Sequence, residues 1–506
     1  MAQQPEREPD FAAAVADYRA ARFTEAAASL REIVKRRRSD AQAAMLLART
    51  QMRLGDPAAA LAALSSISSS RAETKAEIAI LKGAAFARTG DSKSAAAQFR
   101  TAASLATTPQ LRGELANQKA SLEWIERRLD RAEKEIAAMP ADTTPELQLS
   151  TFILRGAIAS AREKLPEQGA LLLEALRRYR DNANDAYLQA MLVTHIAALA
   201  VELPSSELRD AAVAAIDSVR WTRDVADLQF HALRAVAWRH ALEGDEFNAF
   251  RRLKQALAAA SSDEWRVAAL ADRAYLAQAL GEPRWAAQEL RDAHELASGI
   301  DWNAVAGEEK LALPVLAQLF AQSDPAVAIG YVSAFAGAGT NYPRILSSRK
   351  DRRIDALQAY SLGQVQSALG ETAEAKRLLQ QAWKIYSDLG IHWRAARAAI
   401  ALAPIDKSEP WNERASSLLQ SYPRSWMARE IRGAGQPRKT LAGPDAPRLT
   451  AAQSTVLDLL LQGRSTEEIA ASLERSSFTV RNHIKAVLKA YGVNSRAALV
   501  VRAAGH

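Results

Sequence analysis

The chain has no cysteine and only seven histidines among its 506 residues. Without cysteine there can be no disulfide bond, no thiolate metal site and no cysteine nucleophile. The histidines are scattered along the chain without the spacing of a metal site. Because no other nucleophile or acid–base cluster stands out, we expect a protein that is not an enzyme and that holds neither a cofactor nor a metal.

Long apolar runs are missing as well. The first residues, MAQQPEREPDF, are charged and polar and lack the apolar stretch of a signal peptide. The longest apolar segment, LQAMLVTHIAALAVELP, is interrupted by Gln189, Thr194, His195 and Glu202, which argues against a membrane span. We therefore expect a soluble, cytoplasmic protein that makes no membrane contact, with residues 1–8 disordered.

The chain is too long for one hydrophobic core, so several domains or a repeat array are expected. It contains no convincing strand pattern, and a motif recurs along it: a small residue, Ala five positions later, a large apolar residue four after that, and an apolar or small residue three further on. Weaker copies start at Ala21 and Ser323, and part of one is visible from Ala132. The clear copies start at Gly55, Gly90, Gly244, Gly281 and Gly370.

This motif resembles the tetratricopeptide repeat, in its residue types and in its period of 34 positions from Ala21 to Gly55. The Gly would end the first helix of a pair in a left-handed turn, and the Ala would let the two helices approach closely. Between Pro140 and Ser218 the helical periodicity is clear but the motif is faint. We predict an all-α chain whose residues 9–432 form one tetratricopeptide-like α-solenoid, with degenerate repeats in its middle.

Residues 433–447 are predicted to be a linker, because they contain Pro437, Pro444 and Pro447 together with several Gly. Part of this segment, GAGQPRKT, resembles a phosphate-binding Walker A loop. However, Arg438 stands where that loop needs Gly, and no strand precedes it. No ATPase is implied.

The segment SSFTVRNHIKAVLKAYGV differs from the rest of the chain. On a helix from about Ser477 to Tyr491, Val480, Ile484, Val487, Leu488 and Tyr491 share one face, which is typical of a core stripe. No acidic residue occurs from Phe478 to Tyr491. The opposite face carries Phe478, Arg481, Asn482, Lys485 and Lys489. Ser476 or Ser477 can cap the start of this helix, and Gly492 can end it.

Two shorter helices are predicted before it. RLTAAQSTVLDLLLQG has Thr450 and Gln453 at capping-box spacing and stops at Gly463, while STEEIAASL begins at Ser465. Two short helices joined by a tight turn to a third that carries outward cations form the helix-turn-helix layout.

Residues 448–506 resemble the LuxR/FixJ-type helix-turn-helix domain of bacterial transcription regulators. The resemblance implies a small four-helix domain whose third helix, at about 477–491, enters the major groove of double-stranded DNA. It implies base contacts from Arg481, Asn482 and Lys485, and DNA-backbone contacts from Thr479, Lys489 and Arg496. A last helix, from Ser495 to about Ala503, would pair two domains. The matched residues are Leu449, Thr450, Val456, Leu457, Gly463, Ser465, Glu468, Ile469, Ala470, Leu473, Ser476, Thr479, Val480, His483, Gly492, Val493 and Arg496.

Two residues depart from the family pattern: Arg475 replaces a usual aliphatic residue, and Thr466 replaces a frequent Asn. Arg475 would either loosen the turn before the third helix or place a cation beside DNA. The basic excess of the chain supports DNA binding, because eight Lys/Arg and four acids give residues 448–506 a net charge of +4, half of the +8 of the whole chain.

The expected protein is therefore a bacterial DNA-binding transcription regulator. Its solenoid would sense a peptide, a protein or a small molecule in its groove, and contact with RNA polymerase and formation of a homodimer are compatible with this reading. The alternative is a tetratricopeptide-type interaction scaffold whose tail dimerises or contacts RNA polymerase.

Overall fold

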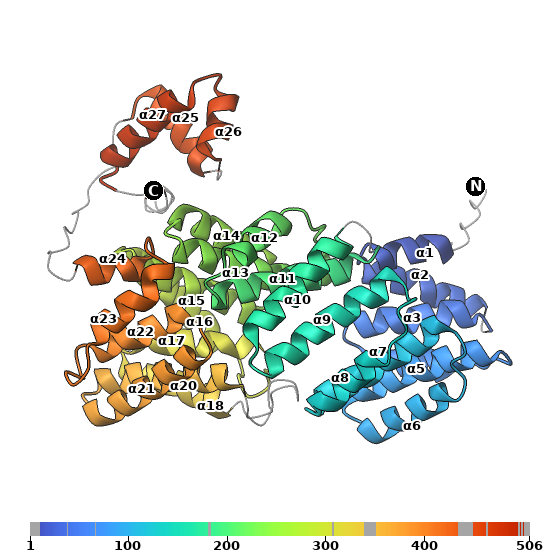
Figure 1. The fold of residues 1–506 in the computed structure, drawn as a ribbon. Coiled ribbons are helices and arrows are strands. Elements are labelled where there is room, and N and C mark those ends of the chain that lie inside the picture. Colours follow the sequence, from blue (N-terminus) through green and yellow to red (C-terminus); the bar gives the residue numbers. More distant parts are fainter. Residues whose placement is uncertain are drawn as a thin grey trace. The chain divides into compact units, whose positions relative to one another are not determined.

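The computed structural model describes residues 11–37, 39–65, 67–180, 184–305, 308–337, 351–433, 449–461, 464–493, 496 and 499. Every regular element in these ranges is a helix (Figure 1), which confirms the predicted all-α fold. The predicted disordered terminus and nearly all of the predicted linker lie outside the described residues. No helix in the described ranges is both long enough and apolar enough to cross a membrane.

The described residues form two compact units. The first unit comprises residues 1–199 and 206–232, and the second comprises 200–205 and 233–506. The helices up to the boundary are α1 (Phe11–Arg19), α2 (Phe23–Arg36), α3 (Ala41–Arg53), α4 (Pro57–Ser65), α5 (Ala72–Thr89), α6 (Ser92–Ala103), α7 (Pro109–Ile125), α8 (Leu129–Ala137), α9 (Pro145–Ala161), α10 (Leu165–Tyr179), α11 (Ala186–Glu202), α12 (Ser206–Ile216) and the 3-10 helix η1 (Arg223–Val225).

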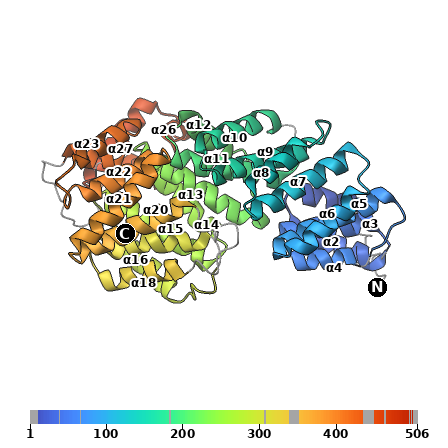
Figure 2. The same cartoon turned by 60° about the horizontal axis from the view of Figure 1, so that its bottom comes forward.

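The second unit contains most of α13 and all later helices. The pairs α20/α21 and α22/α23 follow one another in it, as Figure 2 shows. Its helices are α13 (Ala226–Leu242), α14 (Glu246–Ala259), α15 (Asp263–Ala279), α16 (Pro283–Ser298), η2 (Glu308–Leu311), α17 (Ala312–Phe320), α18 (Pro325–Gly337), α20 (Arg352–Ala368), α21 (Thr372–Asp388), α22 (His392–Leu402), α23 (Trp411–Leu418), η4 (Leu419–Ser421), α24 (Trp426–Gly433), α25 (Ala451–Leu461), α26 (Thr466–Ser472) and α27 (Ser477–Ala490).

Helix pairs of tetratricopeptide type build the first unit and the second unit up to α24, as the repeated motif predicts. At the turn inside a pair, the motif glycine has a left-handed backbone, with φ of 83° at Gly90 and at Gly370. The following residue then bonds back to the first helix, as in the 2.9 Å bond from Asp91 N to Phe86 O. The motif alanines Ala60, Ala95, Ala249 and Ala375 are fully buried, so the two helices of a pair approach closely.

Two further turns have the same backbone without glycine, one just before the stretch where the motif is faint and one inside it. Arg127 and Glu163 adopt left-handed φ values of 59° and 62°, and the residues after them make the same bond, from Arg128 N to Glu123 O and from Lys164 N to Ala159 O. A side chain in this conformation costs on the order of 1–2 kcal/mol. The pair α7/α8 is therefore a repeat that contains the partial copy visible from Ala132. The pair α9/α10 is a second repeat, hidden because Glu163 and Gln168 replace the small residue and the Ala of the motif.

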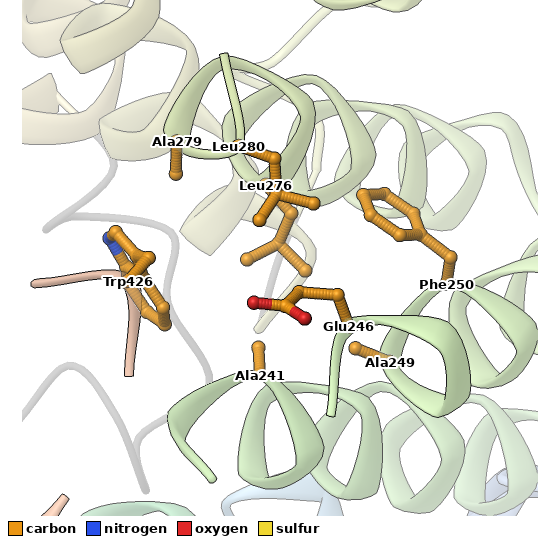
Figure 3. Close-up of a pocket in the computed structure, with 8 residues that line it drawn as sticks. All are labelled: Ala241, Glu246, Ala249, Phe250, Leu276, Ala279, Leu280 and Trp426. Carbon is orange, nitrogen blue, oxygen red and sulfur yellow. The ribbon is translucent and has the colours of Figure 1, made fainter. Parts of the chain in front are cut away.

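The last helix before the predicted linker packs on the start of the second unit. Gly244 leaves room for this approach, because a Cβ atom there would lie 2.4 Å from the carbonyl oxygen of Arg424. Arg429 of α24 pairs with Glu246 of α14. Figure 3 shows Trp426 facing Glu246 and Leu276 across a pocket of about 10 Å³. That volume holds about one water molecule, so the contact is a packed interface and not a ligand site.

Candidate DNA-binding site

Helices α25, α26 and α27 enclose a small core of their own. Val456, Leu457 and Leu460 of α25 pack with Ile469 of α26 and with three residues of α27. Those three, Val480, Ile484 and Val487, are at most 4% exposed. Leu488 and Tyr491 complete the stripe as partly buried residues at its edge. This confirms the predicted inward face of α27.

The predicted caps fix where these helices begin. Thr450 and Gln453 bond reciprocally at the start of α25, and Ser465 and Glu468 form a full capping box at α26. The bond from the Ser465 backbone N–H holds the pKa of the Glu468 carboxyl below its usual range. Ser476, and not Ser477, caps α27 by accepting a 3.1 Å bond from Thr479 N.

The turn between α26 and α27 is tightly closed. Glu474 has a left-handed φ of 51°, and Arg475 N donates to Ala470 O over 2.9 Å. The Arg475 side chain is exposed. Arg475 therefore does not loosen the turn, which is closed by a hydrogen bond. Its side chain instead places a cation on the outside of the domain.

The other face of α27 is fully open. Phe478 is 72% exposed, and Arg481, Asn482, Lys485 and Lys489 are all exposed. Arg can donate two bonds to guanine, Asn can bond adenine through both groups of its amide, and an apolar side chain can touch the thymine methyl group. The outward face thus combines cations with groups whose chemistry suits base edges, and it also exposes the apolar ring of Phe478, for which no role was predicted.

The other two residues predicted to contact the DNA backbone have less exposed side chains. Thr479 is partly buried at the start of α27. Arg496 is also partly buried, donates to the Thr466 hydroxyl and has a pKa lowered mainly by burial. Thr466 is only 7% exposed, so the residue that replaces the family's Asn ties α26 to the segment after α27. The rest of the predicted fourth helix, apart from Leu499, lies outside the described residues.

Among the residues that the structure describes, no group of three or more His, Asp or Glu could hold a metal ion.

Comparison with known proteins assigns the tail to a family. The family described as "Bacterial regulatory proteins, luxR family" (GerE) matches residues 447–503. The spore germination protein GerE of Bacillus subtilis (strain 168) is 44% identical over 55 residues, which make up 11% of this chain and 74% of that protein.

Solved helical structures resemble larger parts of the chain, with low scores. The apo form of the quorum sensor NprR from B. thuringiensis has a TM-score of 0.42 and 11% identity, covering 67% of this chain and 97% of that one. A chain of the APC/C hetero-tetramer Cut9–Hcn1 has a TM-score of 0.27 and 15% identity, covering 81% and 88%.

The functional assignment therefore rests on the tail, where the capped helices, the separate core and the match to GerE coincide. The chain belongs to the luxR family of bacterial regulatory proteins.

Proposed function

We propose that the protein is a transcription regulator in which α27 enters the major groove of promoter DNA and Arg481, Asn482 and Lys485 read base edges. The observation that supports this most is the separation of faces on α27. One face is buried in the three-helix core, and the other exposes these three side chains together. A helix held in this way can be inserted into a groove without unfolding the domain.

Contacts to phosphate would position α27 in the groove. We assign them to Lys489 at the end of α27, to Thr479 at its start, and to Arg496, whose guanidinium has donors beyond the one bonded to Thr466. These groups carry no base preference and set the register of the helix on the duplex.

The helix pairs before the tail would receive the signal, with residues 433–447 as the linker. A peptide, a protein or a small molecule would be the ligand, and the regulator would act in the cytoplasm. Pairing of two tails on two half-sites, and contact with RNA polymerase, are further parts of this proposal. Membership of a family of regulatory proteins agrees with the prediction that the chain is not an enzyme.

The first test is specific binding to a duplex. Sites should be selected from a random DNA pool with the full chain, and the affinity measured by anisotropy at several salt concentrations. We expect the logarithm of the binding constant to fall linearly with the logarithm of salt, with a slope of about −0.9 for each phosphate neutralised. An affinity that stays flat with salt, or a pool without enrichment, would favour the interaction scaffold.

A second prediction concerns the carboxylate next to Arg481. Glu467 of α26 lies 3.8 Å from the Arg481 guanidinium, and both side chains are largely exposed, at 70% and 65%. This weak pair must separate when Arg481 reaches a base. We expect Glu467→Gln to tighten DNA binding about two- to fivefold at low salt, and less at high salt.

The control for that prediction is Asp458→Asn, which changes the net charge equally on the exposed side of α25. If both variants tighten binding to the same extent, the effect comes from net charge and not from release of Arg481.

A further inference from the structure

Arg397, in the second unit, is surrounded by aromatic side chains. The guanidinium carbon of Arg397, on α22, lies 4.6 Å from the ring centre of Tyr275 on α15 and 4.8 Å from that of Tyr360 on α20. The Trp393 ring is 5.7 Å away. These aromatic residues come from α15, α20 and α22, and Arg397 remains partly exposed among them.

Arg397 has no carboxylate partner among the described residues, unlike the stacked arginines Arg394, Arg414 and Arg53. Arg394, one helical turn away, stacks on Trp393 but also bonds Glu202 at 3.0 Å. Arg414 lies over two Trp rings and pairs with Glu409. In unit one, Arg53 stacks on a Tyr ring and pairs with an Asp. The cation of Arg397 is therefore not neutralised by an ion pair.

The neighbouring phenol does not supply the missing negative charge. Burial raises the pKa of Tyr275 to about 12, so its hydroxyl stays neutral near pH 7. The stacking rings stabilise a cation through their faces, typically by an amount too small to replace a buried counter-ion.

A chain of hydrogen bonds holds the guanidinium in place. Arg397 Nη2 donates to Gln318 Oε1 at 2.7 Å. The amide nitrogen of Gln318 donates to Ser361 Oγ at 2.7 Å, and that hydroxyl donates to Pro314 O at 3.2 Å. Because a guanidinium can only donate, the Gln318 amide must present its oxygen to Arg397 and its nitrogen to Ser361. This bond to Gln318 uses one of the five guanidinium N–H groups, and Nε is buried without a hydrogen-bond partner in the described structure.

We propose that Arg397 anchors a binding site for a carboxylate group, carried by a small organic acid or by the free C-terminus of a peptide. A preorganised guanidinium with unused donors binds a carboxylate through two parallel bonds. Tyr275, the only one of the three aromatic residues that is partly exposed, would contact the apolar part next to that carboxylate. The inference rests on the proposed sensor role of the helix pairs, because it names the chemistry that they recognise.

The site is connected to the helix that precedes the tail. Tyr275, which stacks on Arg397, is 6.3 Å from the ring of Trp426 on α24. Trp238 lies against Trp393 at 5.6 Å and against Trp426 at 6.0 Å. A ligand on Arg397 would therefore touch Tyr275, whose ring packs on Trp426 of α24, the last described helix before the predicted linker.

The test compares carboxylates with their amides on the full chain. Hexanoate is titrated against hexanamide, and an acetylated pentapeptide of Ala and Leu with a free C-terminus against its amidated form, with tryptophan emission as the readout. We expect saturable emission changes for the acids, at about millimolar concentration for a fragment of this size, and none for the amides. The stronger of the two acids identifies the source of the carboxylate.

Three variants locate the site. Arg397→Gln should weaken acid binding about 10- to 100-fold, and Arg397→Lys should weaken it less, because it keeps the charge but loses the two-bond geometry. Arg414→Gln, which also removes an arginine stacked on Trp, should leave binding unchanged. If Arg397→Gln misfolds by circular dichroism, the acid–amide difference measured on Arg397→Lys decides instead.

Equal responses to acid and amide would overturn the site. So would acid binding that is unchanged by the Arg397→Gln substitution. Duplex binding measured on the same samples separates this from the proposed function. If DNA binds with strong salt dependence but no acid binds, only the carboxylate site is wrong. If acid binds and DNA does not, the site stands and the proposed regulator does not.

Discussion

Asp272→Ala should destabilise the second unit by about 3–5 kcal/mol. Asp272 on α15 is fully buried and accepts two bonds from Arg234 on α13, one from Nε and one from Nη2 at 3.2 Å. Truncating the carboxylate leaves a guanidinium that is only 16% exposed without its counter-ion. The measurement is urea unfolding followed by tryptophan emission, since only Trp124 and Trp221 of the ten Trp precede the second unit.

The double variant Arg234→Met/Asp272→Leu separates charge from packing. Removing both charges together should recover most of the stability lost in Asp272→Ala, because apolar side chains of similar volume often replace a buried ion pair without loss. Glu374→Ala, which removes the exposed partner of Arg377, should barely move the urea midpoint. A double variant as unstable as the single one would mean that the loss comes from packing.

Arg481→Ala and Asn482→Ala should each cost about 1–3 kcal/mol of binding free energy at the selected DNA site, and should relax the base preference at the contacted position. Lys489→Ala should instead weaken binding to all sequences alike and make the salt slope shallower by about one. The reason is their placement on α27: Lys489 lies in its last turn, whereas Arg481 and Asn482 lie near its start. The affinities are measured against the selected site and a panel of single-base changes.

Retention of base preference in both alanine variants would contradict the groove assignment. So would identical behaviour of all three substitutions, because a purely electrostatic face does not distinguish sequences.

Much of the tail could be predicted from sequence because its determinants are local. The caps Thr450, Ser465 and Ser476, the inward stripe of α27 and the glycine that ends it depend on residues a few positions apart. Gly492 indeed has a left-handed φ of 63°. The roles of Arg481, Asn482 and Lys485 came from the family resemblance together with their side-chain chemistry, and they remain predictions that DNA binding must test.

In the solenoid, the motif predicted the turns that have glycine and the weaker copy at Ala21, showed part of the copy after Arg127, and gave no copy at Glu163. Arg127 and Glu163 pay the cost of a left-handed backbone because the same backbone bond closes the turn whatever the side chain. The pair of Arg234 with Asp272 and the surround of Arg397 could not be predicted. They join residues 38 positions apart in one case and as far apart as Tyr275 and Arg397 in the other. A single sequence does not show which residues of such distant helices meet.

The packing of α24 on the start of the second unit also sets an order of events during synthesis. Arg429 and Glu246 are 183 positions apart in the chain. A ribosome that adds about 5–20 residues per second therefore adds Arg429 roughly 10–40 s after Glu246. During that interval the rings of Trp238 and Tyr275 lack the Trp426 ring that packs against them in the finished protein. A nascent chain paused before α24 would expose these rings to chaperones or to other chains, and the DNA-binding domain would emerge only after that surface has been covered.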